Sequence, residues 1–123
     1  MTRAQACVCA RRSKDDGKPG REPVIVNDGP AGTHQWMPNV AVAADGSVHV
    51  FFMDKRYDPE HKLIDITHAW SEDGGATWKN ERVSKMSYDG DLGVHQDGFP
   101  FIGDYIGVAC VGEDCWAGFP DAS

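Results

Sequence analysis

The sequence predicts an all-β fold, and three observations predict it. Glycine and proline, with 14 and 7 residues, are spread along all 123 positions and leave little room for long helices. Apolar residues alternate with polar ones, or form short β-branched and aromatic runs, between clear turn signals. Short patterns also recur at a spacing near 60 residues. The length suits one modest domain built from short antiparallel strands.

A four-stranded antiparallel meander is predicted over residues 38–84. Residues 39–54 are rich in β-branched and aromatic side chains on both sides of Asp45-Gly46, which is a strong signal for a hairpin turn. Residues 63–71 form the predicted third strand, and residues 78–83 form the fourth.

Charge and hydropathy exclude several classes of partner. The formal net charge is −7, with +4 in residues 1–21 and −11 in the remainder. Because an acidic surface repels phosphate groups, nucleic acid is not an expected partner. The chain has no apolar run long enough for a membrane span and no apolar secretory signal. As given, it is expected in the cytoplasm, although its compartment stays open.

The four cysteines form two close pairs, Cys7 with Cys9 and Cys110 with Cys115. Their spacing matches no zinc site, so no metal is expected there. Cys110 and Cys115 flank a predicted hairpin turn, so they could face each other across two strands and form a disulfide in an oxidising compartment. Two reduced thiols are an equally open alternative.

The recurring patterns indicate a repeated structural unit. Residues 71–78 share Ser, Asp and Gly with residues 13–20, 58 positions earlier. Residues 32–35 and 93–96 match at a spacing of 61. A period near 60 residues that contains four strands is typical of a β-propeller blade, which buries its faces against neighbouring blades.

This unit divides the chain into three segments. Residues 1–31 form a basic N-terminal segment and the end of one blade, residues 32–85 a complete blade, and residues 86–123 the first half of the next. Closed propellers need about four to eight blades, so this chain alone makes an incomplete ring. The missing blades would come from a longer chain or from other copies of this one.

Residues 71–78 resemble the Asp-box, or BNR repeat, of the sialidase-like β-propellers at every fixed position. The matching residues are Ser71, Asp73, Gly75, Thr77 and Trp78. In that family the box is structural, so we expect Asp73 to cap the turn, Gly75 to supply a positive φ and Trp78 to cover the blade core. Residues 13–20 are an incomplete copy whose last two positions differ.

The order of elements across residues 33–84 also resembles the sialidases, with departures that bear on function. Trp36-Met37-Pro38 stands where sialidases carry Arg-Ile-Pro, so one of three arginines that hold the substrate carboxylate is replaced by Trp36. The tyrosine nucleophile and its glutamate partner come from later blades of the family. The chain is therefore not expected to be catalytically complete alone; if active, it would be a sialidase-like glycoside hydrolase.

Four charged residues form the main candidate site: Asp54, Arg56, Asp58 and Glu60. They lie within seven residues at the end of a predicted strand, on a loop that the resemblance places at the central channel. Asp54 and Arg56 would bind hydroxyl or carboxylate groups of a glycan, with Asp58 or Glu60 as general acid beside Arg56. The alternative is an Asp54–Arg56 and Arg56–Asp58 ion-pair set that only stiffens the loop.

Aromatic residues supply candidate ligand contacts. Trp36 and Tyr105 could stack on sugar faces or belong to the core. Trp116, next to Cys115, is predicted to be buried. Arg82, which follows the box, is predicted to lie in solvent.

No cofactor is expected. A group of acids in glycine-rich loops could suit calcium, but it fits no EF-hand, and solvated loop acids are the favoured interpretation. These acids are Asp89, Asp91, Asp97 and Asp104. His34 and His95 occupy equivalent repeat positions, which indicates a structural role in each blade rather than metal binding.

The predicted function is a glycan-related, sialidase-like propeller fragment or module that lacks complete catalytic machinery. A lectin-like module that binds a carbohydrate as a homo-oligomer is one alternative, with three copies supplying six blades. The others are a glycoside hydrolase fragment that uses the loop acids, and a structural fragment without activity.

Overall fold

The structure, a computed structural model, describes residues 6–18 and 20–122. These residues form an all-β fold of short antiparallel sheets with one 3-10 turn, η1 (Gly90–Leu92). The strands are β1 (Cys9–Ala10), β2 (Val24–Ile25), β3 (Gln35–Val42), β4 (Val48–Asp54), β5 (Asp65–Ser71), β6 (Lys79–Arg82), β7 (Val94–Gln96), β8 (Phe99–Phe101), β9 (Gly107–Val111) and β10 (Asp114–Gly118). The predicted all-β class is confirmed. In the described part of the chain, no helix is long and apolar enough to cross a membrane.

The predicted four-stranded meander is present as the central sheet, with strand order β3-β4-β5-β6. The β3–β4 hairpin turns at Asp45-Gly46, where Gly46 has a φ of 85° and the backbone N–H of Ser47 donates to Asp45 Oδ1 at 2.9 Å. Such a turn needs a residue that tolerates positive φ, which explains why the local signal predicted it.

The strand boundaries differ from the prediction at both ends of the sheet. β3 begins at Gln35 and carries a register shift between Trp36 and Asn39, where Met37 has a φ of 54°. β5 begins at Asp65 rather than at residue 63. The Leu63 N–H donates to the Asp58 carboxylate at 2.9 Å, so it is used by the preceding loop instead of by the sheet.

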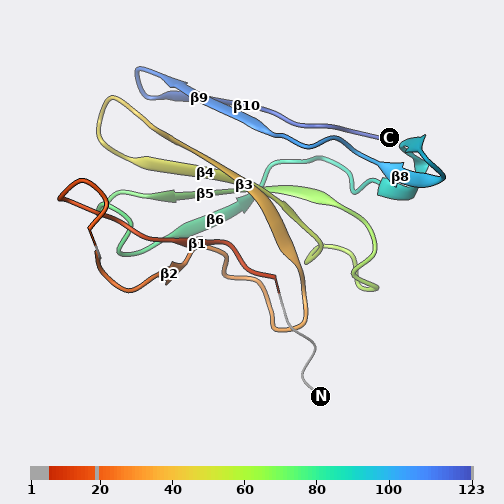
Figure 1. The fold of residues 1–123 in the computed structure, drawn as a ribbon, viewed down its shortest axis with the longest axis horizontal. Helices are drawn as coiled ribbons and strands as arrows, with labels where there is room; N and C mark the ends of the chain where they lie inside the picture. The colour runs from red at the N-terminus through yellow and green to blue at the C-terminus, as the bar shows by residue number, and fades with distance from the viewer. Residues whose placement is uncertain (1–5, 19, 123) are drawn as a thin grey trace.

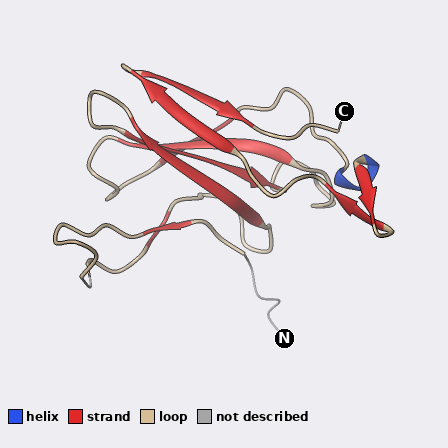
Figure 2. Ribbon diagram, turned by 45° about the horizontal axis from the view of Figure 1, so that its top comes forward, coloured by secondary structure: helices blue, strands red, loops and turns tan. Residues whose placement is uncertain are grey.

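The central sheet lies between two smaller layers (Figures 1 and 2). Val50 and Phe52 of β4 form one apolar cluster with Val8 and Val26 of the β1–β2 layer. The alternate residues of β4 form the second cluster on the opposite face, together with residues of β9 and β10. These alternate residues are Phe51 and Met53. Successive side chains of a strand point to opposite faces, so β4 is buried on both sides.

The C-terminal segment contains two separate hairpins. β7 pairs with β8, a pairing that the sequence did not indicate. β9 and β10 form the second hairpin, in which Cys110 and Cys115 lie directly opposite each other and are joined by a disulfide. The structure therefore contains the disulfide that the spacing left open. The central sheet spans residues 35–82, within the predicted segment 32–85, and the division into three segments remains a prediction.

Candidate functional site

The turn at residues 71–78, between β5 and β6, is named the Asp-box turn after the motif that it resembles, and it is held by a dense set of hydrogen bonds. Ser71 Oγ donates to Asp73 Oδ1 at 2.8 Å and accepts the N–H of Gly75 at 2.8 Å. The N–H groups of Ala76 and Thr77 and the Thr77 hydroxyl all donate to the Asp73 carboxylate. Hydrogen bonds from Thr77 and Ser71 lower the pKa of Asp73.

The box residues have structural positions. Gly75 has a φ of 89°, a conformation that favours glycine. Trp78 packs against the cluster between the central sheet and the β1–β2 layer. The turn therefore caps one end of the sheet and covers its core.

The incomplete copy at residues 13–17 repeats part of this geometry in the β1–β2 layer. The Gly17 N–H donates to Ser13 Oγ at 2.9 Å, and Ser13 Oγ donates to Asp15 Oδ1 at 3.1 Å. Arg12 Nη1 donates to the Gly74 carbonyl at 3.4 Å and so links the two turns. The repeated hydrogen bonds occur 58 positions apart, at the spacing found in the sequence.

Asp54 and Arg56 form a buried ion pair at the other end of the sheet. Asp54 has no exposed side-chain surface and accepts hydrogen bonds from Gln35 Nε2 at 3.0 Å and Thr67 Oγ1 at 2.8 Å. Arg56 Nε lies 2.5 Å from Asp54 Oδ2. Asp54 therefore connects Arg56 to Gln35 of β3 and Thr67 of β5 in one polar cluster.

Arg56 makes further contacts that use most of its donors. It forms an ion pair with Asp28 and donates from Nη2 to Asn80 Oδ1 at 3.2 Å. Burial lowers the pKa of Arg56, but hydrogen bonds to Asp28 and Asp54 outweigh burial and raise it overall. The arrangement matches the alternative in which Arg56 only forms ion pairs. Its second partner, however, is Asp28 and not the expected Asp58.

Asp58 and Glu60 lie apart from this cluster, in the β4–β5 loop. Asp58 Oδ2 accepts the N–H groups of Leu63 and Lys62 at 2.9 and 2.8 Å, and these bonds lower the pKa of Asp58. A general acid needs the opposite shift, because it must hold its proton near neutral pH. Glu60 is exposed and pairs with Lys62 at 2.7 Å.

Trp36 and Tyr105 lie at neighbouring strand starts. Trp36 is half-buried, and Lys55 Nζ lies 5.6 Å from the centroid of its ring. Tyr105 precedes β9 and is 85% exposed. Asn39 Nδ2 donates to the Ile106 carbonyl at 2.7 Å, which holds the segment before β9 against the first half of β3. The two rings therefore belong to the same end of adjoining layers.

No protein-family model, curated protein or solved structure matches this chain. Its interpretation therefore depends on the residues themselves.

Among the described residues, no group of three or more His, Cys, Asp or Glu side chains is arranged to hold a metal ion. Asp89 instead caps η1, accepting the N–H of Asp91 at 2.9 Å. Asp97 and Asp104 are exposed, as is His95. His34 Nδ1 accepts the N–H of Ala6 at 3.3 Å, which is a structural contact with the first described residues.

Arg82 is exposed, as the sequence predicts, but its Nη2 also lies 2.7 Å from Asp65 Oδ1, and Asp65 has no exposed side-chain surface. One sequence-based expectation is wrong. Trp116, expected to be buried, is 70% exposed. It alternates with Cys115 and Ala117, which pack against the central sheet, so its ring lies on the outer face of the β9–β10 hairpin.

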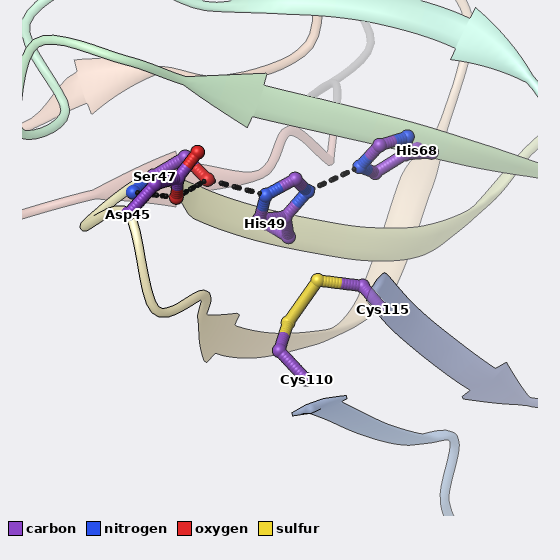
Figure 3. The surroundings of a disulfide bond; sticks show 6 residues. All are labelled: Asp45, Ser47, His49, His68, Cys110 and Cys115. Carbon is purple, nitrogen blue, oxygen red and sulfur yellow. Dashed lines mark hydrogen bonds between the residues drawn. A yellow bond between two sulfur atoms is a disulfide. The ribbon is translucent and has the colours of Figure 1, made fainter. Parts of the chain in front are cut away.

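The sequence analysis also missed a hydrogen-bonded chain on one face of the central sheet (Figure 3). Ser47 Oγ lies 2.5 Å from Asp45 Oδ1 and 2.8 Å from His49 Nε2. His49 Nδ1 lies 2.9 Å from His68 Nε2, and His68 Nδ1 lies 2.8 Å from Glu81 Oε1. The available signal was the alternation of Ser47 and His49, which places both on one face of a strand.

Proposed function

We propose that this chain forms part of a sialidase-like β-propeller that binds a glycan and contributes no complete catalytic site. The observation that carries the proposal is the Asp-box turn, whose Gly75-to-Ser71 hydrogen bond recurs as Gly17 to Ser13. Two such turns in adjoining layers support a repeated unit of one kind.

The strand arrangement supports the same proposal. β3 to β6 correspond to the four strands of one blade. β1 and β2, which flank the incomplete Asp-box, correspond to the third and fourth strands of the preceding blade. β9 and β10 correspond to the first and second strands of the following blade. All of these sheets are antiparallel and stack through apolar faces, as blades do.

The glycan would bind at the end of the blades opposite the Asp-boxes. Val48 pairs with Ser71 near the boxes, whereas Asp54 pairs with Asp65 at the other end. Trp36 and Tyr105 lie at this second end, at the starts of two successive blades. Tyr105 is exposed and offers an aromatic face for a pyranose ring. Trp36 is half-buried with Lys55 Nζ over its ring, so a sugar would meet the exposed part of the indole together with the Lys55 donor.

Binding is favoured over hydrolysis because the acids and the arginine are committed elsewhere. Arg56 is held by Asp54 and Asp28, and only 11% of its side chain is exposed. The pKa of Asp58 is lowered by the Leu63 and Lys62 N–H groups. These contacts stabilise the β4–β5 loop, and neither Arg56 nor Asp58 is suited to protonate a leaving sugar.

The experiment that tests this proposal is a glycan array followed by calorimetric titration with the best ligand. We expect binding that Trp36→Ala and Tyr105→Ala each weaken by about tenfold, because one stacked ring contributes on the order of 1 kcal/mol. Trp36→Phe and Tyr105→Phe keep a ring and should retain most of the affinity. A blank array, or binding indifferent to both alanine variants, would contradict the proposal.

A fluorogenic sialoside tests the catalytic alternative in the same preparations. We expect no turnover by the chain alone. Release of the fluorophore that is abolished by Asp58→Asn would instead establish the hydrolase reading and overturn the non-catalytic part of the proposal.

A further inference from the structure

An apolar groove lies beside β1, between the β1–β2 layer and the β3–β4 half of the central sheet. It has a volume of about 830 Å³. The central sheet lines it with Pro38, Val40, Val42, Val48 and Val50. Val40 and Val42 are 58% and 60% exposed. β1 and β2 therefore cover only part of this face of the central sheet. A packed layer with as many strands as the central sheet would cover the whole face.

The outer face of the β9–β10 hairpin is a second exposed apolar surface. Trp116 on β10 is 70% exposed, and Val111 at the end of β9 is 73% exposed. Both point away from the central sheet, because Cys110 and Cys115 occupy the alternate, inner positions. Two large apolar side chains exposed on the same face of a small hairpin favour an interaction surface there.

The β1–β2 pair and the β9–β10 hairpin each have an open edge as well. In the described residues, β1 pairs only with β2, and β10 pairs only with β9. An unpaired edge presents backbone N–H and C=O groups that can pair with another strand. β1 and β10 lie on opposite sides of the central sheet, so they cannot pair within one chain (Figure 1).

We propose that the β9–β10 hairpin of one copy of this chain docks in the groove of a second copy, where β10 pairs with β1. The resulting sheet has the order β9-β10-β1-β2, which is the order of the four strands in the central sheet. The contact is head-to-tail, so each copy offers a hairpin at one end and a groove at the other. It uses none of the residues proposed to bind a glycan.

The register follows from the repeat spacing. In the central sheet, His49 of β4 lies opposite Trp70 of β5. The spacing of 58 residues relates Trp70 to Arg12. Phe52 and Asp54 of the second strand recur as Phe119 and Asp121, at a spacing of 67, which relates His49 to Trp116. Trp116 of one copy therefore lies opposite Arg12 of the next, where a guanidinium can stack on the indole. The indole faces Val40 and Val42 in the groove.

The charges of the two surfaces are complementary. Arg11, Arg12 and Arg21 line the groove together with one acid, Glu22, whereas the β9–β10 turn carries Glu113 and Asp114. Both sets lie at the Asp-box end of the molecule. Arg12 contacts the Gly74 carbonyl there, and the Ala44 N–H of the β3–β4 turn donates to the Gly112 carbonyl at 2.7 Å. Opposite charges at one end favour this orientation of the docked hairpin.

The exposed area of the chain also agrees with the proposed head-to-tail interface. The chain exposes 8183 Å², which is about 1,700 Å² more than a compact monomer of 13.4 kDa would expose. A standard interface removes on the order of 800 Å² from each partner, and a head-to-tail assembly uses two such surfaces on each copy. The excess is therefore of the size that two such surfaces would bury.

Cysteine cross-linking between copies tests the pairing. Gly118 lies opposite Ala10 in the proposed register, and a Cβ added at Gly118 meets nothing within 4 Å. We would prepare Ala10→Cys and Gly118→Cys as separate proteins in a Cys7→Ser, Cys9→Ser background and mix them under mild oxidation. We expect a covalent heterodimer that forms faster than the homodimer of either variant. Absence of this cross-linked product would overturn the proposal.

Light scattering measures the assembly itself. We expect a mass above 13.4 kDa, with three times that value for a six-bladed ring. Trp116→Asp should weaken association at least tenfold, as loss of a central aromatic anchor does. Phe99→Asp is the matched control, because Phe99 is 75% exposed but lies on β8, outside both surfaces. A monomer at every concentration, or equal effects of the two variants, would contradict the interface while leaving glycan binding open.

Discussion

His49 and His68 share a hydrogen bond of 2.9 Å between Nδ1 of the first and Nε2 of the second, across the β4–β5 pair. A single proton can occupy that bond, so one of the two rings must act as acceptor. Ser47 with Asp45 lies at one end of this pair and Glu81 at the other. The rings also stack, with centroids 5.1 Å apart. Hydrogen bonds and stacking therefore fix both rings on this face of the sheet.

Acidification should destabilise the fold through His49. Desolvation and the neighbouring His68 lower the pKa of His49, an effect that Asp45 partly opposes. The unfolded chain then binds the proton more readily than the folded one. Stability is therefore highest above the ordinary histidine pKa of about 6.5 and falls as the pH drops through and below it. Melting temperatures between pH 7 and 5 should fall more for the native protein than for His49→Gln.

The control for this measurement is His95→Gln, which alters an exposed histidine on β7 outside the hydrogen-bonded chain. Its melting curves should follow those of the native protein. A pH dependence that is the same in all three proteins would mean that His49 does not set it.

Features that depend on a few adjacent residues were predictable from the sequence. The Asp45-Gly46 turn and the Asp-box are local devices, in which side chains bond to backbone groups no more than four positions away. The β-branched and aromatic residues of 39–54 then predicted two strands, of which β4 is buried on both faces. The four-stranded sheet follows from these turns and that alternation.

The contacts across strands were not predictable in the same way. The Arg82–Asp65 pair depends on the register of β5 against β6, and the His49–His68 pair on that of β4 against β5. Register is set jointly by turn geometry and by packing on both faces. A shift of one residue in either strand would have placed the paired side chains on opposite faces of the sheet. The exposure of Trp116 likewise depends on whether another layer packs on the outer face of the β9–β10 hairpin, which a local sequence pattern does not show.

Removal of Arg56 should destabilise the fold strongly. Arg56→Ala leaves the fully buried Asp54 without its cation and is expected to cost about 3 kcal/mol. Lys62→Ala is the matched control, because it breaks the exposed Lys62–Glu60 pair and should cost less than about 1 kcal/mol. Urea unfolding of the two variants measures both values. Equal stabilities would show that Arg56 is dispensable for folding and would favour a role in ligand binding.

The two Asp-box turns should differ in their contribution to stability. Ser71 is buried, so Ser71→Ala leaves the Gly75 N–H without its acceptor and should cost about 2 kcal/mol. Ser13 is exposed, and its bond to the Gly17 N–H can be replaced by water. Ser13→Ala should therefore change the free energy of unfolding by less than about 0.5 kcal/mol. Denaturant midpoints at constant slope separate these outcomes, and a larger effect at Ser13 would contradict the assignment of Ser71 as the structural turn.

The disulfide should stabilise the outer hairpin more than the rest of the fold. Cys110 and Cys115 are five positions apart, and closing so short a loop contributes about 2 kcal/mol through the unfolded chain. Replacing both by serine should speed hydrogen exchange of β9 and β10 while the central sheet keeps its protection. The single change Cys9→Ser removes an exposed thiol outside the bond and serves as the control. Uniform loss of protection in all sheets would mean that the hairpin and the central sheet unfold together. The contact that would couple them is the packing of Cys115 against the apolar cluster of Phe51 and Met53.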